Sequence, residues 1–207
     1  MKVPDTAAQW LSHELYDWGG ANVDVFVAAQ RALPDTWLWL PEMLSAVGSY
    51  WAAPVALVLM LDWQRTQNRL DAIRRRVSLC RFVAGLTLGL GATALAKAAF
   101  ALPRPSIVLG DVVYRSVTAI DSRYTFPSGH AVFVGVLAAA LWPTVDWSVR
   151  IALLLFAATV GWSRIVLGAH FPADVIAGFT LGWVCVVVVS KPVDQIARFL
   201  SRAAVSR

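Results

Sequence analysis

The sequence predicts an all-α fold, a polytopic bundle of membrane-spanning helices, from three observations. Of the 207 residues, 58% are hydrophobic and only 15% are charged, which is too apolar for a soluble domain of this length. Several windows reach the roughly 20 apolar residues that cross a bilayer core of about 30 Å. Basic residues cluster beside these windows, as they do at the cytoplasmic ends of membrane helices.

Five stretches are apolar enough to be membrane spans. They cover residues 37–61, 79–102, 129–142, 149–166 and 172–190. The third and the fourth are short, so they must tilt or borrow flanking residues. We expect residues 22–33 to form a helix in the membrane interface, in preference to a sixth span, because Asp24, Gln30 and Arg31 interrupt its apolar side.

This pattern divides the chain into three parts. Residues 1–36 are an N-terminal interfacial or spanning segment, residues 37–190 a membrane domain, and residues 191–207 a basic cytoplasmic tail. Within the membrane domain, residues 103–127 are polar and rich in turn-forming residues, which predicts one long loop.

The basic residues orient the predicted bundle. Ten of the 18 lie in two blocks: Arg65, Arg69, Arg74, Arg75, Arg76 and Arg81, and then Lys191, Arg198, Arg202 and Arg207. Blocks beside spans favour the positive-inside pattern over a nucleic-acid surface, so we expect a bilayer and no nucleic acid as partner. With the residues 62–78 in the cytoplasm, the second and fourth spans end outside, and the third and fifth begin there.

Residues suited to phosphate chemistry occur at these four outer ends. Lys97 is followed seven residues later by Arg104, about two helical turns or roughly 10 Å away if the helix continued. Each alone could be a flanking or snorkelling charge. Pro103 and Pro105 should break the helix and let the guanidinium fold back beside the ammonium. The planar guanidinium of arginine and the compact ammonium of lysine together suit the oxygens of a phosphate.

The second segment is Pro-Ser-Gly-His, residues 127–130. Ser128 precedes an apolar run and is a natural N-cap, and Gly129 lets a substrate approach the backbone. Helix capping would explain both residues, but it does not explain His130. The N–H groups and the positive dipole end of a helix beginning here form a ready anion site.

The third segment runs from Ser163 and Arg164 to His170 and Asp174. The i, i+4 spacing puts His170 and Asp174 on one helical face, so the carboxylate can hold the proton of one ring nitrogen and expose the lone pair of the other. Such a pair is often structural. Here the pair lies at the end of a span and faces a second histidine and three cations. This setting favours a catalytic pair, in which the carboxylate orients a nucleophilic histidine.

These three segments resemble the signature motifs of the type 2 phosphatidic acid phosphatase superfamily, K-x6-RP, PSGH and SR-x5-H-x3-D. Every fixed position is matched between Lys97 and Asp174. The family usually has six spans, whereas this sequence shows five and an N-terminal segment. The difference affects the region that shapes the lipid entrance and leaves the motifs intact.

The resemblance implies a role for each matched residue. His170 would attack phosphorus and form a phosphohistidine, which Asp174 orients and stabilises. His130 would protonate the leaving group and then activate water. Phosphoryl oxygens would be held by Lys97, Arg104, Ser128, Gly129 and Arg164. The resemblance implies no metal and no other cofactor, and the sequence lacks an acidic cluster suited to magnesium.

A membrane setting and these motifs favour a phosphorylated lipid as substrate. Undecaprenyl pyrophosphate, hydrolysed to undecaprenyl phosphate, is our leading expectation; phosphatidic acid, phosphatidylglycerophosphate and lipid A phosphate are the alternatives. A lipid phosphotransferase, a vanadate-dependent haloperoxidase and a lipid-binding or transport protein are further functions compatible with some of these features. The haloperoxidase relatives are soluble, and a binding protein would not need both histidines. We expect a multi-pass protein of the cytoplasmic (inner) membrane with its site on the periplasmic or extracellular side.

Overall fold

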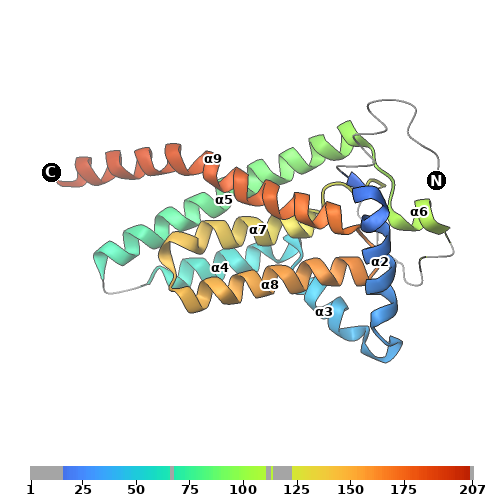
Figure 1. Cartoon of the computed structure of the whole chain (residues 1–207). Coiled ribbons are helices and arrows are strands. Elements are labelled where there is room, and N and C mark those ends of the chain that lie inside the picture. The colour runs from blue at the N-terminus through green and yellow to red at the C-terminus, as the bar shows by residue number, and fades with distance from the viewer. Residues whose placement is uncertain (1–15, 66–67, 111–112, 114–122, 206–207) are drawn as a thin grey trace.

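Figure 1 shows the computed structural model of the chain, in which helices form a bundle. The structure describes residues 16–65, 68–110, 113 and 123–205. Within these residues the only β pairing is an isolated bridge between Pro103 and Tyr124, so the all-α prediction is confirmed. The α-helices are α2 (Ala21–Ala32), α3 (Trp39–Val47), α4 (Ala53–Trp63), α5 (Arg69–Phe100), α6 (Pro105–Leu109), α7 (Gly129–Leu141), α8 (Trp147–Val166) and α9 (Pro172–Val205).

Among the described residues, three continuous helices are long and apolar enough to cross a membrane. Their spanning parts are Leu70–Phe100, Trp147–Val166 and Pro172–Ala197. The predicted span 129–142 is a helix, but with its last turn it reaches only Gly129–Thr144, shorter than the usual crossing length. The prediction of five continuous spans is therefore wrong in its count, although each predicted stretch is helical.

The first predicted span, residues 37–61, is two helices bent by 54° and not one rod. A Cβ atom on Gly48 would lie 2.4 Å from the side chain of Val160, so the chain meets α8 closely here. Ser49 is extended and its hydroxyl accepts from the N–H of Trp51, which starts a new helical turn. Pro54 then lies in the first turn of α4, where proline is tolerated. Local capping and contact with α8 thus interrupt an unbroken apolar run.

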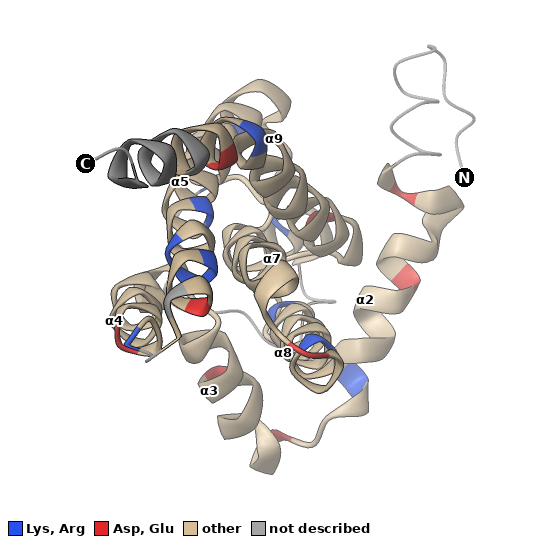
Figure 2. Ribbon diagram, turned by 90° about the vertical axis from the view of Figure 1, so that its left-hand side faces the viewer, with Lys and Arg blue, Asp and Glu red and all other residues tan. Residues whose placement is uncertain are grey.

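Two helices are longer than the sequence predicted. Helix α5 begins at Arg69, after Asn68 has capped it by accepting from the N–H groups of Leu70 and Asp71, so the first basic block lies largely on helix and not in a loop. Helix α9 continues to Val205 and does not end at residue 190. Arginine is a good helix former, and α9 continues through Pro192 into its polar extension. In Figure 2, basic residues follow the near end of α5.

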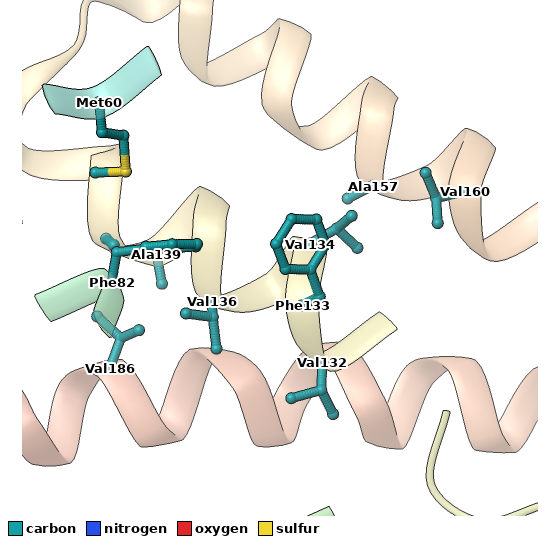
Figure 3. Packing of buried hydrophobic residues seen from close by; sticks show 11 residues of the cluster. Met60, Phe82, Val132, Phe133, Val134, Val136, Ala139, Ala157, Val160 and Val186 are labelled. Atoms are coloured by element: carbon teal, nitrogen blue, oxygen red, sulfur yellow. The ribbon is translucent and has the colours of Figure 1, made fainter. Parts of the chain in front are cut away.

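Helix α7 is the centre of the bundle and packs against α5, α8 and α9. Ten of its thirteen residues are buried. Figure 3 shows Val132, Phe133 and Val136 of α7 among apolar side chains from four other helices. A Cβ atom on Gly182 would lie 2.4 Å from the carbonyl oxygen of Val132, which is how closely α9 approaches α7. Small residues allow such backbone contact between membrane helices.

Helix α2 crosses the ends of the bundle helices, at the right of Figure 1. Its twelve residues extend about 18 Å, too short for a bilayer core, which agrees with an interfacial helix. Asn22, Phe26 and Gln30 are its buried residues, and they lie on the side facing the bundle. Gln30, which interrupts its apolar pattern, is therefore used with Asn22 for contact with the protein.

Candidate active site

Four helix ends bring the predicted site residues to one end of the bundle. These are the C-termini of α5 and α8 and the N-termini of α7 and α9, at the right of Figure 1. The polar residues gathered here are largely withdrawn from solvent: Arg104, Ser128, His130, Arg164, His170 and Asp174 are all buried. Burying so many ionisable groups is costly unless they are paired or serve a reaction.

Backbone and side-chain contacts fasten the first two segments together. Helix α5 ends before Pro103, with Ala101 in the left-handed conformation, as the prolines predicted. The N–H of Thr125 donates to the carbonyl of Leu102 at 2.9 Å. The ammonium of Lys97 donates to the carbonyl of Tyr124 at 2.6 Å. The chain that leads into α7 is thus held against the end of α5.

The third segment begins where α8 ends. Gly168 has a φ of 72°, a conformation that favours glycine, and the N–H groups of Ala169 and His170 turn back to the carbonyl of Arg164 at 3.0 and 3.3 Å. Arg104 reaches this turn and donates to the carbonyl of Ala169 at 2.8 Å. The N–H of Ser128 donates to the carbonyl of Asp174 at 3.1 Å. All three predicted segments therefore meet at this turn.

The carboxylate of Asp174 is fully buried and held by several donors. Its Oδ2 atom accepts from the hydroxyl of Thr125 at 2.5 Å and from the N–H of Phe171 at 2.8 Å. Its Oδ1 atom accepts from the hydroxyl of Tyr16 at 2.8 Å. Such a network fixes both the position and the rotation of the carboxylate.

Thr125 also contacts the ring of His170, with 3.1 Å between Oγ1 and Nδ1. Because its single hydroxyl hydrogen is donated to Asp174, the oxygen accepts from Nδ1–H of the imidazole. The direct distance from Nδ1 to Oδ2 of Asp174 is longer, 3.5 Å. The predicted His170–Asp174 pair is thus brought together, with Thr125 as an intermediate. This tautomer leaves the lone pair on Nε2.

The ring of His170 is neutral at physiological pH. Burial lowers its pKa from the ordinary value of 6.5 to about 4, and the charges of Arg164 and Arg104 act in the same direction. The hydrogen bonding and the charge of Asp174 oppose this change without reversing it. A buried, neutral imidazole with one nitrogen already donating is suited to act as a nucleophile.

The second histidine, His130, begins α7 close to the same cations. It lies near enough to Arg164, Arg104 and Lys97 to be influenced by their charges. Its ring meets the ring of Tyr50 edge to face, with 5.9 Å between centroids. Arg164 donates to the hydroxyl of Ser45 on α3. The two bent helices within residues 35–63 thus supply Ser45 and Tyr50 to the surroundings of the site.

Ser128 occupies the N-cap position of α7, as predicted, but its side chain makes no capping bond. The hydroxyl is buried and has no hydrogen-bond partner among the described residues. A buried hydroxyl without a partner is costly, so its presence needs an explanation. The first N–H groups of α7 follow it, and such groups at a helix start are donors of the kind that bind anions.

Sequence reasoning missed four residues that surround the predicted ones: Tyr16, Ser45, Tyr50 and Thr125. Thr125 lies three residues before Ser128, and its closeness to that segment was a usable signal. Tyr16 is 158 residues from its partner Asp174, and Ser45 is 119 residues from Arg164. No spacing rule connects such distant residues, because the bundle alone brings them together.

The fold and the site define a helical membrane protein with two histidines and several cations gathered at one end of its bundle. The PAP2 superfamily model matches residues 78–196, more than half of the chain, and the protein belongs to this superfamily of membrane lipid phosphatases. It is therefore a phosphatase, an enzyme that hydrolyses phosphate esters.

Individual relatives act on different lipids. An undecaprenyl-diphosphatase of Sulfolobus acidocaldarius is 30% identical over 186 residues, 87% of this chain and 85% of that protein. A lipid A 1-phosphatase of Rhizobium etli is 43% identical over 61 residues, 28% of this chain and 25% of that protein. The crystal structure of a PAP2-type phosphatidylglycerolphosphate phosphatase from Bacillus subtilis has a TM-score of 0.68 with 19% identity over 89% of each chain, which supports the fold.

Proposed function

We propose that the protein hydrolyses undecaprenyl pyrophosphate to undecaprenyl phosphate through a phosphohistidine on His170. The observation that carries the mechanism is the hydrogen-bonded series from Nδ1 of His170 through Thr125 to Asp174. It leaves the lone pair of Nε2 available and places a buried negative charge behind the ring. The imidazole can therefore attack phosphorus and accept the positive charge that follows.

In the first step, Nε2 of His170 forms a bond to the terminal phosphorus as the bond from phosphorus to the leaving oxygen breaks. His130 gives its proton to that oxygen, so the lipid leaves as a phosphate. The proton on Nδ1 stays between His170 and Thr125, and Asp174 balances the charge of the phosphorylated ring. These steps start with His170 neutral and His130 protonated. Because burial and the neighbouring cations disfavour a charged His130, the bound anionic phosphate must stabilise its proton.

In the second step, His130 takes a proton from water, and the water oxygen attacks the phosphorus. The bond between phosphorus and Nε2 breaks, which releases inorganic phosphate and restores both histidines. In both steps, charge on the phosphoryl oxygens is stabilised by donors that are already in place. We assign this role to Lys97, Arg104, Arg164, Ser128 and the N–H of Gly129.

The extent of similarity supports a pyrophosphate lipid. The relationship to the undecaprenyl-diphosphatase extends over most of both chains, whereas that to the lipid A 1-phosphatase covers a quarter of the relative. The higher identity of this shorter match, 43%, makes a lipid A phosphate the second candidate. Phosphatidylglycerophosphate is the third, because a relative of similar fold acts on it.

We place the active site on the outer face of the cytoplasmic membrane. Helix α5 carries the arginine-rich block in its first turns and Lys97 in its last turn, so the basic block and the site lie at opposite ends of one long helix. Arginine clusters beside spans remain in the cytoplasm. The end that holds His170 therefore faces the periplasm or the exterior, where a recycled carrier lipid would present its pyrophosphate.

The purified protein, assayed with a panel of phosphorylated lipids, tests this proposal. We expect the fastest release of inorganic phosphate from undecaprenyl pyrophosphate. Faster release from lipid A or phosphatidylglycerophosphate would show that this other lipid is the preferred substrate. Transfer of phosphate to a second lipid without free phosphate would instead indicate a phosphotransferase.

The variant His170→Ala tests the nucleophile in the same assay. It should fold in detergent, lose all turnover and form no phosphohistidine after an alkaline quench, because the other imidazole of the described site, His130, is assigned to the leaving oxygen. Thr159→Ala removes an exposed hydroxyl of α8 and serves as the control with unchanged activity. Substantial turnover by the folded His170→Ala protein would refute the mechanism.

A further inference from the structure

The N-terminal helix α2 is fastened to the turn that carries His170. The N–H of Ala173 donates to the amide oxygen of Asn22 at 3.0 Å, and the amide of Gln30 donates to the carbonyl of Val166 at 3.3 Å. Both polar side chains are 1% exposed. These two contacts bracket residues 166–173, so α2 holds the catalytic turn at both of its ends.

Between these contacts, aromatic rings pack the helix onto the turn. The rings of Phe26 and Phe171 lie 5.2 Å apart. Tyr16 precedes α2, and its ring meets Phe126 and Phe171 edge to face at 5.8 and 6.4 Å. Edge-to-face pairs fix the direction in which a ring points. The ring of Tyr16 is therefore held with its hydroxyl directed at one acceptor.

That acceptor is Oδ1 of Asp174, 2.8 Å from the hydroxyl oxygen. Burial, followed by the charge of Asp174, raises the pKa of Tyr16 above its ordinary value, so the hydroxyl keeps its proton and donates it. The other oxygen of the carboxylate, Oδ2, accepts from Thr125 and from the N–H of Phe171. The two oxygens thus have separate donors from separate parts of the chain.

We propose that Tyr16 is a positioning residue for the catalytic carboxylate, so that the N-terminal segment completes the active site of this enzyme. The inference rests on the function proposed above, in which Asp174 orients His170. A carboxylate can rotate about its terminal bond, and a donor on Oδ1 opposes that rotation. Tyr16 thereby keeps Oδ2 directed at Thr125, and Thr125 keeps Nδ1–H of His170 in place.

A purely structural role makes a different prediction. If Tyr16 only helped to dock α2, its loss would act through stability, and any change that loosened α2 would have the same effect. If it acts through the carboxylate, its loss should slow the chemical step without weakening substrate binding. It should also have little effect once Asp174 has lost its charge.

The variant Tyr16→Phe keeps the ring and removes only the hydroxyl. We expect kcat for a short-chain isoprenoid pyrophosphate to fall about tenfold with KM changed less than twofold, the size expected for losing one charge-assisted hydrogen bond. Ala28→Gly weakens α2 at an exposed position and leaves the hydroxyl and both contacts with the turn in place, so it should lower the melting temperature and largely keep kcat. Equal loss of kcat in the two variants would overturn the proposal.

A double-mutant cycle provides the decisive measurement. Asp174→Asn should be slow by itself, and adding Tyr16→Phe to it should change kcat less than twofold, because the two residues act as one unit. A further tenfold loss in the double variant, or wild-type kcat in Tyr16→Phe alone, would refute the role of Tyr16. Both results are read against an active wild-type enzyme and an inactive His170→Ala variant, so failure of the function itself would be recognised separately.

Discussion

The hydroxyl oxygen of Thr125 lies 3.1 Å from Nδ1 of His170, closer than the carboxylate that the sequence pairs with this histidine. The threonine donates to Asp174 and accepts from the imidazole, so it decides which ring nitrogen keeps the proton. The orienting group of this site is therefore a hydroxyl and a carboxylate in series. Thr125 provides the hydrogen-bonded connection, while the charge of Asp174 also acts on the ring directly across 3.5 Å.

Replacing Thr125 tests this arrangement. Thr125→Val has nearly the same shape but no hydroxyl, and we expect kcat to fall on the order of a hundredfold, because the ring loses its acceptor and its preferred tautomer. Thr125→Ser keeps the hydroxyl and should restore most of the activity. Thr93→Val removes a buried hydroxyl of α5 that bonds within its own helix, and it should leave kcat unchanged. Equal activity of the valine and serine variants at position 125 would contradict the proposed series.

The protonation of His170 can be observed directly by nitrogen NMR of ¹⁵N-histidine-labelled protein. The sequence has three histidines, and the His170→Gln variant assigns the relevant signals. Because the pKa of His170 is lowered to about 4, its ring should remain neutral at pH 5.5 with the proton on Nδ1. An unperturbed histidine would be about 90% protonated at that pH. A ring that becomes charged near pH 6.5 would show that burial does not control it.

Ser128→Ala tests the proposed oxyanion site at the start of α7. The hydroxyl has no partner in the described part of the chain, so its loss should not lower thermal stability. We expect kcat/KM to fall about tenfold, as for removal of one donor to a charged phosphoryl oxygen. Ser190→Ala removes a hydroxyl that bonds within α9, and its activity should be normal. A destabilised Ser128→Ala protein with full activity would assign the hydroxyl to the fold instead.

Two glycine variants test the close contact between α7 and α9. In Gly182→Ala the new methyl group would meet the backbone of Val132, which cannot move without shifting α7, so we expect a loss of about 1–3 kcal/mol or more in stability. Gly91→Ala adds the same methyl group to α5, where nothing lies within 4 Å, and should be neutral or stabilising. Thermal unfolding in detergent compares them. Similar melting temperatures of the two variants would mean that α7 and α9 can move apart to accept the methyl group at little cost.

The predictable part of the site lies where local sequence sets the geometry. Arg164 and His170 could be assigned to helix ends because apolar spans stop beside them, and His130 because Ser128 is an N-cap before an apolar run. The orientation of the bundle then placed these ends together. Spacing also paired His170 with Asp174, although it could not reveal that the hydroxyl of Thr125 lies between them.

The parts that were missed depend on contacts between distant segments. The apolar run from residue 37 to residue 61 gives no warning of a break, because the break at Gly48 reflects its contact with Val160 of another helix. The start of α5 was missed because hydropathy follows the lipid boundary, whereas the hydrogen bonds of a helix continue into water. The role of Tyr16 depends on how α2 crosses the bundle.

The burial of α7 has a consequence for how a lipid is handled. His130 begins a helix that is buried along most of its length against α5, α8 and α9. We therefore expect the substrate to insert its headgroup into the protein and to leave its tail among the surrounding lipids. We expect the enzyme to tolerate tails of different length and branching, and to choose among substrates by the size and charge of the group attached to the phosphate.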